Sequence, residues 1–435
     1  MIFYRRLGLN HFEYRKGEMY CEDVPLARIA RQVGSPAYVY SSATLTRHFQ
    51  VFDQPFKKMD HLVCFSVKSL SNIAVLRLFA NLGSGFDIVS KGELYRVEKA
   101  GGDTSRVVFS GVGKTEAEIE YALRKNILLF NVESEAELEQ INRVAAKLRK
   151  KARVSLRVNP DVNPRTDHHI STGMKKNKFG IEVKKALSIY RNWRSYKNVE
   201  MVGVDCHIGS QLLEMAPILE ALARTLDLVK KLRGLGLNIK YLDLGGGLGI
   251  TYFKENPPLP REYASEILRF AKDINCKIIL EPGRVLVGNS GVLLLKVVYL
   301  KQGSVKKFVI VDAGMNALIR PALYGAHHEI MPLRQKPVNK KNIADVVGPI
   351  CESTDFLAKD RALPEIKAGD YLAVMSAGAY GFVMASNYNS FPRPAEVIVC
   401  GNKFHVARER ESYGQLIAGE KVPGFLQKGK MGKKC

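Results

Sequence analysis

The chain has 435 residues, of which 46% are hydrophobic and 25% charged, an ordinary globular composition with room for a barrel-sized domain and a second domain. No apolar run approaches the ~18 residues needed to cross a bilayer, and the charged N-terminal stretch lacks the apolar core of a signal peptide, so we expect a cytoplasmic protein that does not bind membranes. The net charge is +23, but Lys and Arg are spread throughout, which favours attraction of anionic small molecules over nucleic-acid binding.

The first elements predicted along the chain are strands. Residues 1–35 contain the alternating stretch HFEYRKGEMYCEDVPL, from which we expect a strand or two that join a β-rich domain. From residue 61 onward, apolar runs rich in Val, Ile, Leu or Phe alternate with helical patterns, as buried parallel strands do. The eight runs are 62–67, 85–89, 106–110, 127–131, 152–158, 201–206, 239–244 and 277–281.

Helix signals separate these runs. Thr115-Glu-Ala-Glu118 and Ser134-Glu-Ala-Glu137 are capping-box signatures that each open a helix directly after a strand. Residues 216–236 are periodic and end with Lys, Arg and Gly, which is typical of a helix C-terminus. The repeated strand–helix units predict an α/β fold, a (β/α)₈ TIM barrel over residues 36–288, with a doubly wound sheet as the alternative.

After Gly288 the pattern changes to short strands bounded by Gly and Pro. Residues 292–314 indicate a hairpin, and 370–378 and 395–401 indicate further strands. We therefore expect a β-rich C-terminal domain, a small barrel or sandwich, over residues 289–420. Residues 421–435 end in the basic run KGKMGKKC, which is typical of a disordered tail.

Polar residues follow several predicted strands, at the edge where TIM barrels carry their active sites. Lys68 follows the first strand, where it is either a surface side chain or a partly desolvated amine able to attack an aldehyde. His207 follows the sixth strand and stands close to Ser210. The glycine run 245–247 follows the seventh strand and predicts either a tight turn or a phosphate cradle.

The eighth strand ends in Glu281-Pro-Gly-Arg284. This Glu and Arg could pair with each other, but the ends of strands seven and eight commonly bind phosphate, and a carboxylate there can hold a proton on a pyridine nitrogen. Neither the glycine run nor Gly111-Val-Gly-Lys-Thr115 completes a nucleotide-binding motif. The seven cysteines include no CxxC pair, which argues against a disulfide framework and a zinc site. A phosphorylated aldehyde cofactor explains the set, whereas no metal-ligand spacing does.

Several independent motifs over residues 20–415 together resemble the fold-type III decarboxylases that depend on pyridoxal 5'-phosphate (PLP). The motifs are FSVKSLSN, GFDIVSKGEL, VNPDVNPRTDHHISTGMKKNKFGI, HIGSQ, LGGGLGI, EPGR, DAGMNALIRPALYGAHH, GPICESTDFL, GAYG and SNYNSFPRPAEV. The resemblance implies a (β/α)₈ barrel joined to a β domain. It is strongest to the members that convert meso-2,6-diaminopimelate to L-lysine and CO₂, the final step of lysine synthesis.

The resemblance also implies roles for individual residues at the cofactor. Lys68 holds PLP as a Schiff base, His207 stacks on its ring and Glu281 contacts its pyridine nitrogen. Asp87 matches an acidic residue near the lysine. The phosphate contacts implied by the resemblance are Ser210, Gly246, Gly283 and Arg284, with Tyr380 close to them.

For the substrate, the resemblance implies contacts from Arg284, Arg320, Tyr324, Glu352 and Tyr380. Arginine forks bind carboxylates and Glu accepts from an ammonium group, which suits a substrate with a zwitterion at its distal end. Cys351 matches a proton donor that the other subunit contributes. The catalytic set is thus Lys68, His207 and Cys351, and the active unit is a homodimer with shared active sites.

Four other functions remain open from the sequence. The first is a PLP-dependent decarboxylase of another amino acid, such as ornithine, lysine or carboxynorspermidine, against which Arg320 and Tyr324 argue. A racemase of similar barrel type is the second. A non-catalytic PLP carrier is the third, although such proteins tend to lack a large β domain. A nucleic-acid binder is the fourth and rests on charge alone.

Overall fold

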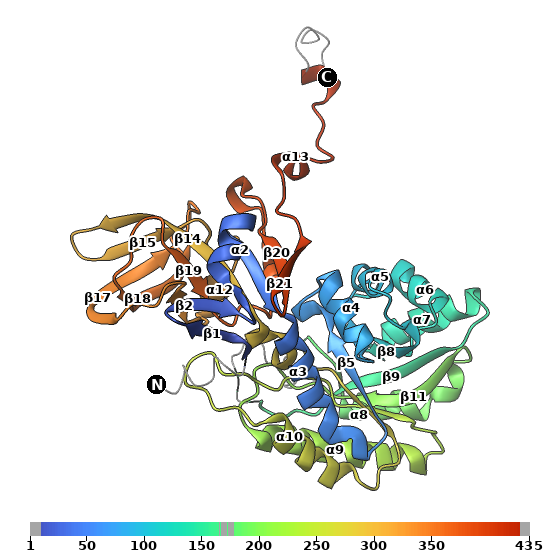
Figure 1. The fold of residues 1–435 in the computed structure, drawn as a ribbon. Helices are drawn as coiled ribbons and strands as arrows, with labels where there is room; N and C mark the ends of the chain where they lie inside the picture. The colour runs from blue at the N-terminus through green and yellow to red at the C-terminus, as the bar shows by residue number, and fades with distance from the viewer. Residues whose placement is uncertain (1–9, 165, 167–171, 173–177, 427–435) are drawn as a thin grey trace.

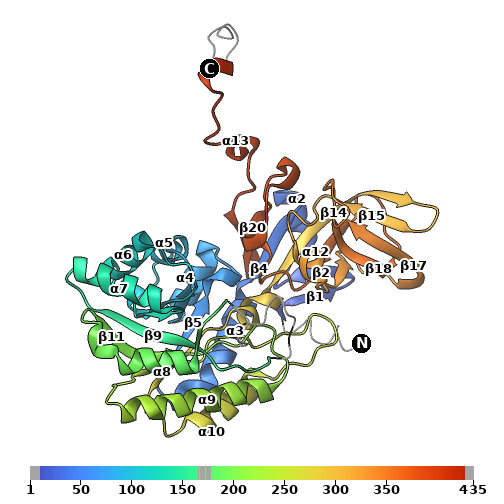
Figure 2. The same ribbon diagram turned by 180° about the vertical axis from the view of Figure 1, so that it is seen from behind.

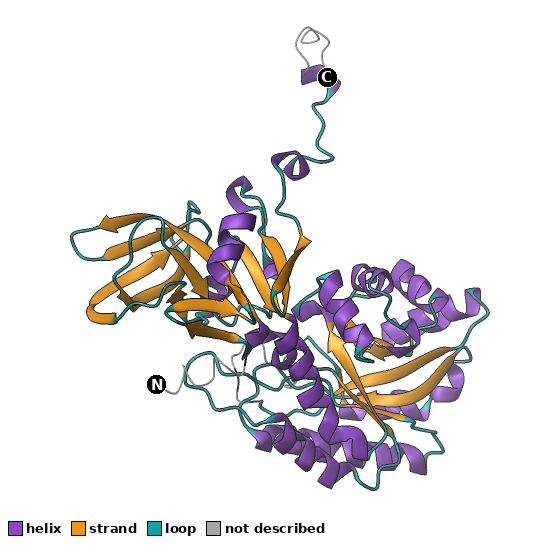
Figure 3. Cartoon of the chain, in the orientation of Figure 1, coloured by secondary structure: helices purple, strands orange, loops and turns teal. Residues whose placement is uncertain are grey.

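The computed structural model describes residues 10–164, 166, 172 and 178–426, and it consists of a helix-wrapped barrel beside a strand-rich body (Figures 1 and 3). Each of the eight predicted barrel strands is formed. They are β5 (His61–Ser66), β6 (Gly85–Ile88), β7 (Val107–Phe109), β8 (Leu129–Val132), β9 (Ala152–Asn159), β11 (Val199–Asp205), β12 (Tyr241–Asp243) and β13 (Lys277–Leu280).

The strands form a closed parallel ring. Neighbours pair in the order β9-β11-β12-β13-β5-β6-β7-β8, and β8 pairs again with β9. The register Ile278 to His61 joins the last strand to the first. Closure excludes the doubly wound alternative, which would leave two open edges. The two-residue strand β10 (Ile181–Glu182) adds to β9 outside the ring.

Helices cover the outside of the ring (Figure 3). α3 (Ser42–Asp53) precedes β5, and short α11 (Arg284–Val287) follows β13. Those between the strands are α4 (Ile73–Asn81), α5 (Lys91–Lys99), α6 (Glu116–Arg124), α7 (Glu135–Lys147), α8 (Val183–Arg191), α9 (Met215–Gly234) and α10 (Pro260–Ala271). Phe65 of β5 packs on Phe79 of α4 with ring centroids 4.4 Å apart. Each such fully buried side chain contributes roughly 1.5–3 kcal/mol.

Of the two predicted capping boxes, one is complete. Thr115 and Glu118 satisfy each other's backbone amides at the start of α6. At α7, Ser134 Oγ accepts from the Glu137 amide, but the reciprocal half of the prediction is wrong. The Glu137 carboxylate accepts instead from the Glu133 amide and from Lys114 Nζ, at 2.8 and 2.7 Å. The buried Lys114 competes for this carboxylate, and a pattern read over four consecutive residues does not include a residue so far away in the sequence.

The strand-rich body contains a nine-stranded sheet in the order β18-β17-β15-β14-β4-β20-β21 with β19 and β16 attached. Its central hairpin, predicted from the sequence, is formed by the long strand β14 and the shorter antiparallel strand β15. The strands are β4 (Ala37–Ser41), β14 (Gly291–Gln302), β15 (Lys307–Val311), β16 (Ile330–Pro332), β17 (Val338–Val347), β18 (Phe356–Pro364), β19 (Tyr371–Val374), β20 (Ala395–Cys400) and β21 (Lys403–Arg408).

Strand β4 precedes the barrel in the chain but pairs between β14 and β20, so the chain leaves this sheet for the barrel and later returns to it. The N-terminal strands form a separate antiparallel sheet, which packs on this body through a shared apolar cluster. They are β1 (Phe12–Arg15), β2 (Glu18–Cys21) and β3 (Val24–Pro25), followed by α2 (Leu26–Val33). The division of the chain at residues 35, 288 and 420 stays a prediction.

Two short helices complete the elements that matter for the site. α12 (Arg320–Tyr324) follows β15, and α13 (Tyr413–Leu416) follows β21. Beyond β21 the chain runs away from both bodies, as the two opposite views agree (Figures 1 and 2). Within the described ranges, none of the helices combines the length and the apolar character required to traverse a membrane.

Candidate active site

Lys68 lies in a single 3₁₀ turn (Val67–Ser69) directly after β5, at the edge where the barrel strands end. Its Nζ donates to Asp87 Oδ2 at 2.7 Å, and the same oxygen accepts from Ser66 Oγ at 2.8 Å. Asp87 belongs to β6 and is fully buried, whereas the Lys68 side chain is 36% exposed. The amine is therefore held at the barrel mouth by a carboxylate and remains accessible from one side.

The charge state of Lys68 is set by opposing effects. Burial lowers its pKa, but the carboxylates of Asp87 and Glu281 outweigh burial, and the pKa lies above its ordinary value. The amine is thus an ammonium in this structure. Because an ammonium has no lone pair, Lys68 must lose a proton before it can attack an aldehyde.

A buried polar network lies inside the barrel below Lys68. The Asn131 side-chain amide donates to Asp243 Oδ2 at 3.0 Å and to Glu281 Oε1 at 3.2 Å. Burial, together with the Asp243 and Asp87 carboxylates, raises the pKa of Glu281 well above its ordinary value. Burial and Asp205 raise the pKa of Asp243 to about 7. The surroundings of Glu281 therefore favour its protonated form over the carboxylate more than water does.

His207 and the glycine run meet beside this network. The Gly246 amide donates to His207 Nδ1 at 3.1 Å, so the imidazole proton must sit on Nε2. Burial, with the charges of Arg157 and Lys68, lowers the His207 pKa well below its ordinary value, so the ring is neutral. A Cβ at Gly246 would stand 2.1 Å from the Glu281 carbonyl oxygen, so only glycine allows this turn to lie against the end of β13.

Arg284 opens α11 and is buried at the mouth. Its guanidinium donates to the Tyr252 hydroxyl at 2.7 Å and to Ser210 Oγ at 3.1 Å, and it lies 4.9 Å from the Tyr380 ring centroid. Its Nε is buried without a hydrogen-bond partner in the described part of the chain. The pairing of Glu281 with Arg284, one alternative from the sequence, is absent from the described contacts of both residues.

Arg320 opens α12 from the strand-rich body and reaches the same tyrosine. Its guanidinium lies 4.6 Å from the Tyr252 ring centroid and donates to His328 Nε2 at 2.8 Å, while its Nε has no partner among the described residues. Tyr324, one helical turn further along α12, is close enough to influence the pKa values of both Arg284 and Arg320. Burying a cation without an anion is costly, so this pair indicates a receptor for anionic groups.

These observations fit PLP. A lysine amine is present for attachment, a buried acid for the pyridine nitrogen, and a neutral imidazole for one ring face. Ser210, the glycine turn and the unpartnered Arg284 Nε can receive a phosphate. A Cβ at Gly283 would lie 3.1 Å from the Ser66 side chain, which keeps α11 close to Lys68. The Gly246 amide, however, is already committed to His207 here.

Cys351 and Glu352 lie apart from this cluster. Both are exposed, and both are held by the segment that contains Tyr388 and Asn389. The Cys351 amide donates to Asn389 Oδ1 at 2.7 Å, and the Tyr388 hydroxyl donates to Glu352 Oε2 at 3.4 Å. Within the described part of the chain, neither side chain has a hydrogen bond with a barrel residue. One chain therefore brings together the other predicted site residues but not these two.

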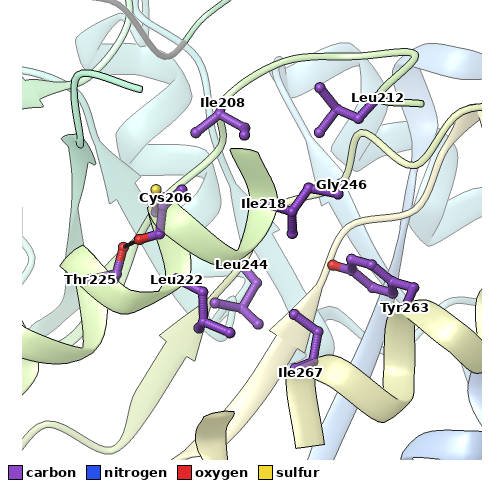
Figure 4. Close-up of a pocket in the computed structure, with 11 residues that line it drawn as sticks. Cys206, Ile208, Leu212, Ile218, Leu222, Thr225, Leu244, Gly246, Tyr263 and Ile267 are labelled. Carbon is purple, nitrogen blue, oxygen red and sulfur yellow. Dashed lines mark hydrogen bonds between the residues drawn. The ribbon is translucent and has the colours of Figure 1, made fainter. Parts of the chain in front are cut away.

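An apolar hollow adjoins the glycine turn, between α9 and α10 (Figure 4). Gly246 is at its rim, and Figure 4 shows Leu212, Leu244, Tyr263 and Ile267 facing it. Its lining contains no charged residue, so it suits side-chain packing behind the turn and not a phosphate or an amino acid.

Three residues of the site escaped the sequence analysis. Tyr252 follows the glycine run at the end of the seventh strand, a position that could have suggested it. His328 stands in a motif that carried the family resemblance but had no role assigned to it. Asn131 ends the fourth strand, and nothing in the sequence near it indicates that it joins two carboxylates.

Comparison with known proteins gives one consistent family. Residues 42–288 match the pyridoxal binding domain of the pyridoxal-dependent decarboxylases. The chain is 52% identical to diaminopimelate decarboxylase of Vibrio cholerae, over 95% of this chain and 99% of that protein. It is 51% identical to the Haemophilus influenzae enzyme of the same name, again over 95% and 99%.

Solved structures agree. Helicobacter pylori diaminopimelate decarboxylase complexed with L-lysine superposes with a TM-score of 0.87 at 42% identity, covering 90% of this chain and 98% of that one. The M. jannaschii enzyme complexed with L-lysine gives a TM-score of 0.92 at 38% identity, covering 97% and 100%. A Selenomonas ruminantium lysine decarboxylase, at 24% identity over 86% of this chain and 95% of that one, shares the fold with a TM-score of 0.77.

Proposed function

The chain belongs to the diaminopimelate decarboxylases of the pyridoxal-dependent decarboxylase family, and from this premise we propose that it converts meso-2,6-diaminopimelate to L-lysine and CO₂ with PLP as cofactor, in the biosynthesis of lysine. The structural observation that carries the proposal is the pair of buried arginines, without acidic partners among the described residues, beside an accessible lysine amine. Decarboxylation of ornithine or lysine is not favoured, because proteins so named are similar in fold alone.

The cofactor-binding residues follow from the site. Lys68 would attach PLP, Glu281 would contact its ring nitrogen and His207 would cover one ring face. Ser210, Gly246, Gly283, Arg284 and Tyr380 surround the phosphate. When bound, PLP supplies an electron-poor ring that takes up the electron pair left by departing CO₂.

Proton positions in the chain prepare this chemistry. Asp87 Oδ2 lies 2.7 Å from Lys68 Nζ and holds the ammonium at the mouth until its proton leaves. Burial and the neighbouring carboxylates raise the pKa of Glu281, which favours a proton on the residue that would contact the ring nitrogen. His207 stays neutral, so it adds no positive charge beside an electron-poor ring.

The arginines explain the preference for a substrate that has a carboxylate at its far end. Arg284 and Arg320 both contact Tyr252, the first through its hydroxyl and the second at its ring. A substrate carboxylate that pairs with such a buried arginine relieves the cost of the unpaired charge. Ornithine has no carboxylate at its distal end, so its binding leaves this cost in place. Tyr324 and Tyr380 line the same space.

Cys351 and Glu352 act from a second copy of the chain, which makes the enzyme a homodimer with shared active sites. Their exposure, and the lack of a hydrogen bond from either side chain to a described barrel residue, support this assignment. Cys351 protonates the carbon from which CO₂ has left, and Glu352 accepts from the distal ammonium of the substrate.

The segment 412–426, which we call the C-terminal arm, also supports the proposed dimer. Its root is tied down by Glu411, which accepts from the Arg393 side chain at 2.6 Å and from Asn387 at 2.7 Å. Asn387 is two residues from the Asn389 that binds Cys351. Five large apolar side chains of the arm are more than half exposed, namely Tyr413, Ile417, Val422, Phe425 and Leu426. Such side chains gain most from burial on another chain.

The function is tested by measuring CO₂ release from meso-2,6-diaminopimelate, ornithine and lysine with the purified protein. Release from the first substrate alone, with L-lysine as the second product, is the expected result. Turnover of ornithine or lysine with none of diaminopimelate would contradict the proposal. The cytoplasmic location stays a prediction from the sequence.

A further inference from the structure

His328 is completely buried and contacts one of the two receptor arginines. Its Nε2 lies 2.8 Å from Arg320 Nη1, and its Nδ1 lies 2.8 Å from the Met375 carbonyl oxygen. Its ring meets Tyr252 edge-on, with centroids 5.4 Å apart. The imidazole is thus fixed by two hydrogen bonds and by an aromatic contact with Tyr252, whose hydroxyl accepts from Arg284.

The partners of His328 determine where its proton sits. A carbonyl oxygen only accepts, so Nδ1 must carry the hydrogen that is donated to Met375. A guanidinium only donates, so Nε2 must offer a lone pair to Arg320. Burial, with the charge of Arg320, lowers the pKa of His328 well below its ordinary value, which agrees with this neutral form.

A neutral acceptor has a particular consequence for Arg320. His328 takes up Nη1 and leaves the edge of the guanidinium formed by Nε and Nη2, of which Nε has no partner among the described residues. That edge carries two parallel N–H groups, the geometry that binds a carboxylate with two hydrogen bonds. An Asp or Glu in place of His328 would also orient Arg320, but it would neutralise the charge that a substrate carboxylate needs.

We propose that His328 is a positioning residue for substrate selection: it orients Arg320 without neutralising it, so that the open edge of the guanidinium receives the carboxylate that the substrate keeps through the reaction. This inference rests on the proposed function. Decarboxylation removes one carboxylate of diaminopimelate and leaves the other on L-lysine, so L-lysine carries the group that Arg320 recognises.

Two ligands isolate this contact without any turnover. L-lysine and cadaverine (1,5-diaminopentane) share the same carbon chain and amines and differ only by the carboxylate. Two variants isolate the acceptor. In His328→Asn the side-chain amide reaches the place of Nδ1 and loses the contact with Arg320, whereas in His328→Gln the longer side chain places an acceptor near that of Nε2.

The experiment measures the Kd of L-lysine and of cadaverine by calorimetry for the PLP-loaded wild type and both variants, together with KM and kcat for diaminopimelate. His328→Asn is expected to raise the Kd of L-lysine about tenfold, which corresponds to the loss of one hydrogen bond to a charged group. The same variant is expected to raise KM for diaminopimelate more than it lowers kcat. Its affinity for cadaverine is expected to stay unchanged, and His328→Gln is expected to recover most of the L-lysine affinity.

Three outcomes would overturn the inference. They are equal weakening of both ligands by His328→Asn, wild-type L-lysine affinity in His328→Asn, and a His328→Gln variant no better than His328→Asn. A fall in cadaverine affinity would indicate a general structural role. If the wild type itself neither binds L-lysine nor releases CO₂ from diaminopimelate, the proposed function fails instead, and the two failures are thereby distinguished.

Discussion

The barrel mouth and the face around Cys351 carry residues assigned to one reaction, yet they differ in almost every physical respect. At the mouth, Lys68, Asp87 and Glu281 are enclosed by hydrogen bonds from several barrel strands. On the other face, Cys351 and Glu352 are exposed and are held by one loop. The Lys68 cluster lies within one chain, whereas Cys351 and Glu352 are proposed to complete the site of a second copy of the chain.

The largest effect is expected from removal of the lysine that defines the mouth. Lys68→Ala should lower CO₂ release by at least about 10³-fold and abolish covalent capture of the cofactor, because it removes the amine to which the proposed function assigns the attachment. Borohydride reduction followed by peptide mapping measures the attachment. Lys91→Ala, on the exposed start of α5, is the control and should keep both properties. A label on a peptide without residue 68 in the wild type would contradict the assignment.

The second effect tests whether the two regions meet across chains. Cys351→Ala should lower kcat about 10²–10³-fold, the usual worth of a positioned proton donor. Mixing it with Lys68→Ala after dissociation should restore activity, because a mixed dimer has one intact site. Random mixing returns about a quarter of wild-type activity when each site uses both chains. No recovery in dimers shown to be mixed would mean that Cys351 works within its own chain or not at all.

The third effect concerns the C-terminal arm. A chain that ends after Ser412 loses the exposed apolar side chains and should show a dimer dissociation constant raised at least about tenfold, since each buried large apolar side chain is worth roughly 1.5–3 kcal/mol. Sedimentation equilibrium measures this constant. A chain that ends after Leu426 retains the arm and is the matched control. Val305→Lys, at a 90% exposed position in the β14–β15 turn, should have no effect. Equal dissociation constants for both truncated chains would show that the arm does not contribute to the dimer interface.

The smallest effect is expected at the root of the arm. The hydrogen bonds from Arg393 lower the pKa of Glu411 from 4.5 to about 2. Because this folded-state pKa is depressed, the stabilisation is present above the ordinary pKa and is lost as the pH falls through the folded value. Glu411→Gln should therefore lower the free energy of unfolding by about 1 kcal/mol at pH 7.

Urea unfolding at several pH values checks this expectation. The gap between wild type and Glu411→Gln should shrink as the pH falls from 4.5 toward about 2. A gap that is constant over this range would mean that the ionised carboxylate is not what holds the arm root.

Local signals in the sequence determined much of the barrel. Eight apolar runs, each followed by a helix pattern, were enough for the strands, because a strand buried on both faces must be apolar throughout. The place of Lys68, His207, the glycine run and Glu281 followed, since residues at the carboxyl ends of parallel strands share one edge of the barrel. The family motifs then supplied roles that spacing alone did not.

Only the tertiary structure decided which partners these residues have. Strand β4 precedes the barrel in the chain but pairs with strands of the other body. The Glu137 carboxylate accepts from Lys114 instead of completing the capping box at the start of α7. Tyr252 is far in sequence from Arg320 and His328, yet the three side chains meet at one point. A hydrogen bond or an unpaired buried charge depends on distances in space between residues far apart in sequence, and periodicity and motif spacing contain no information about those distances.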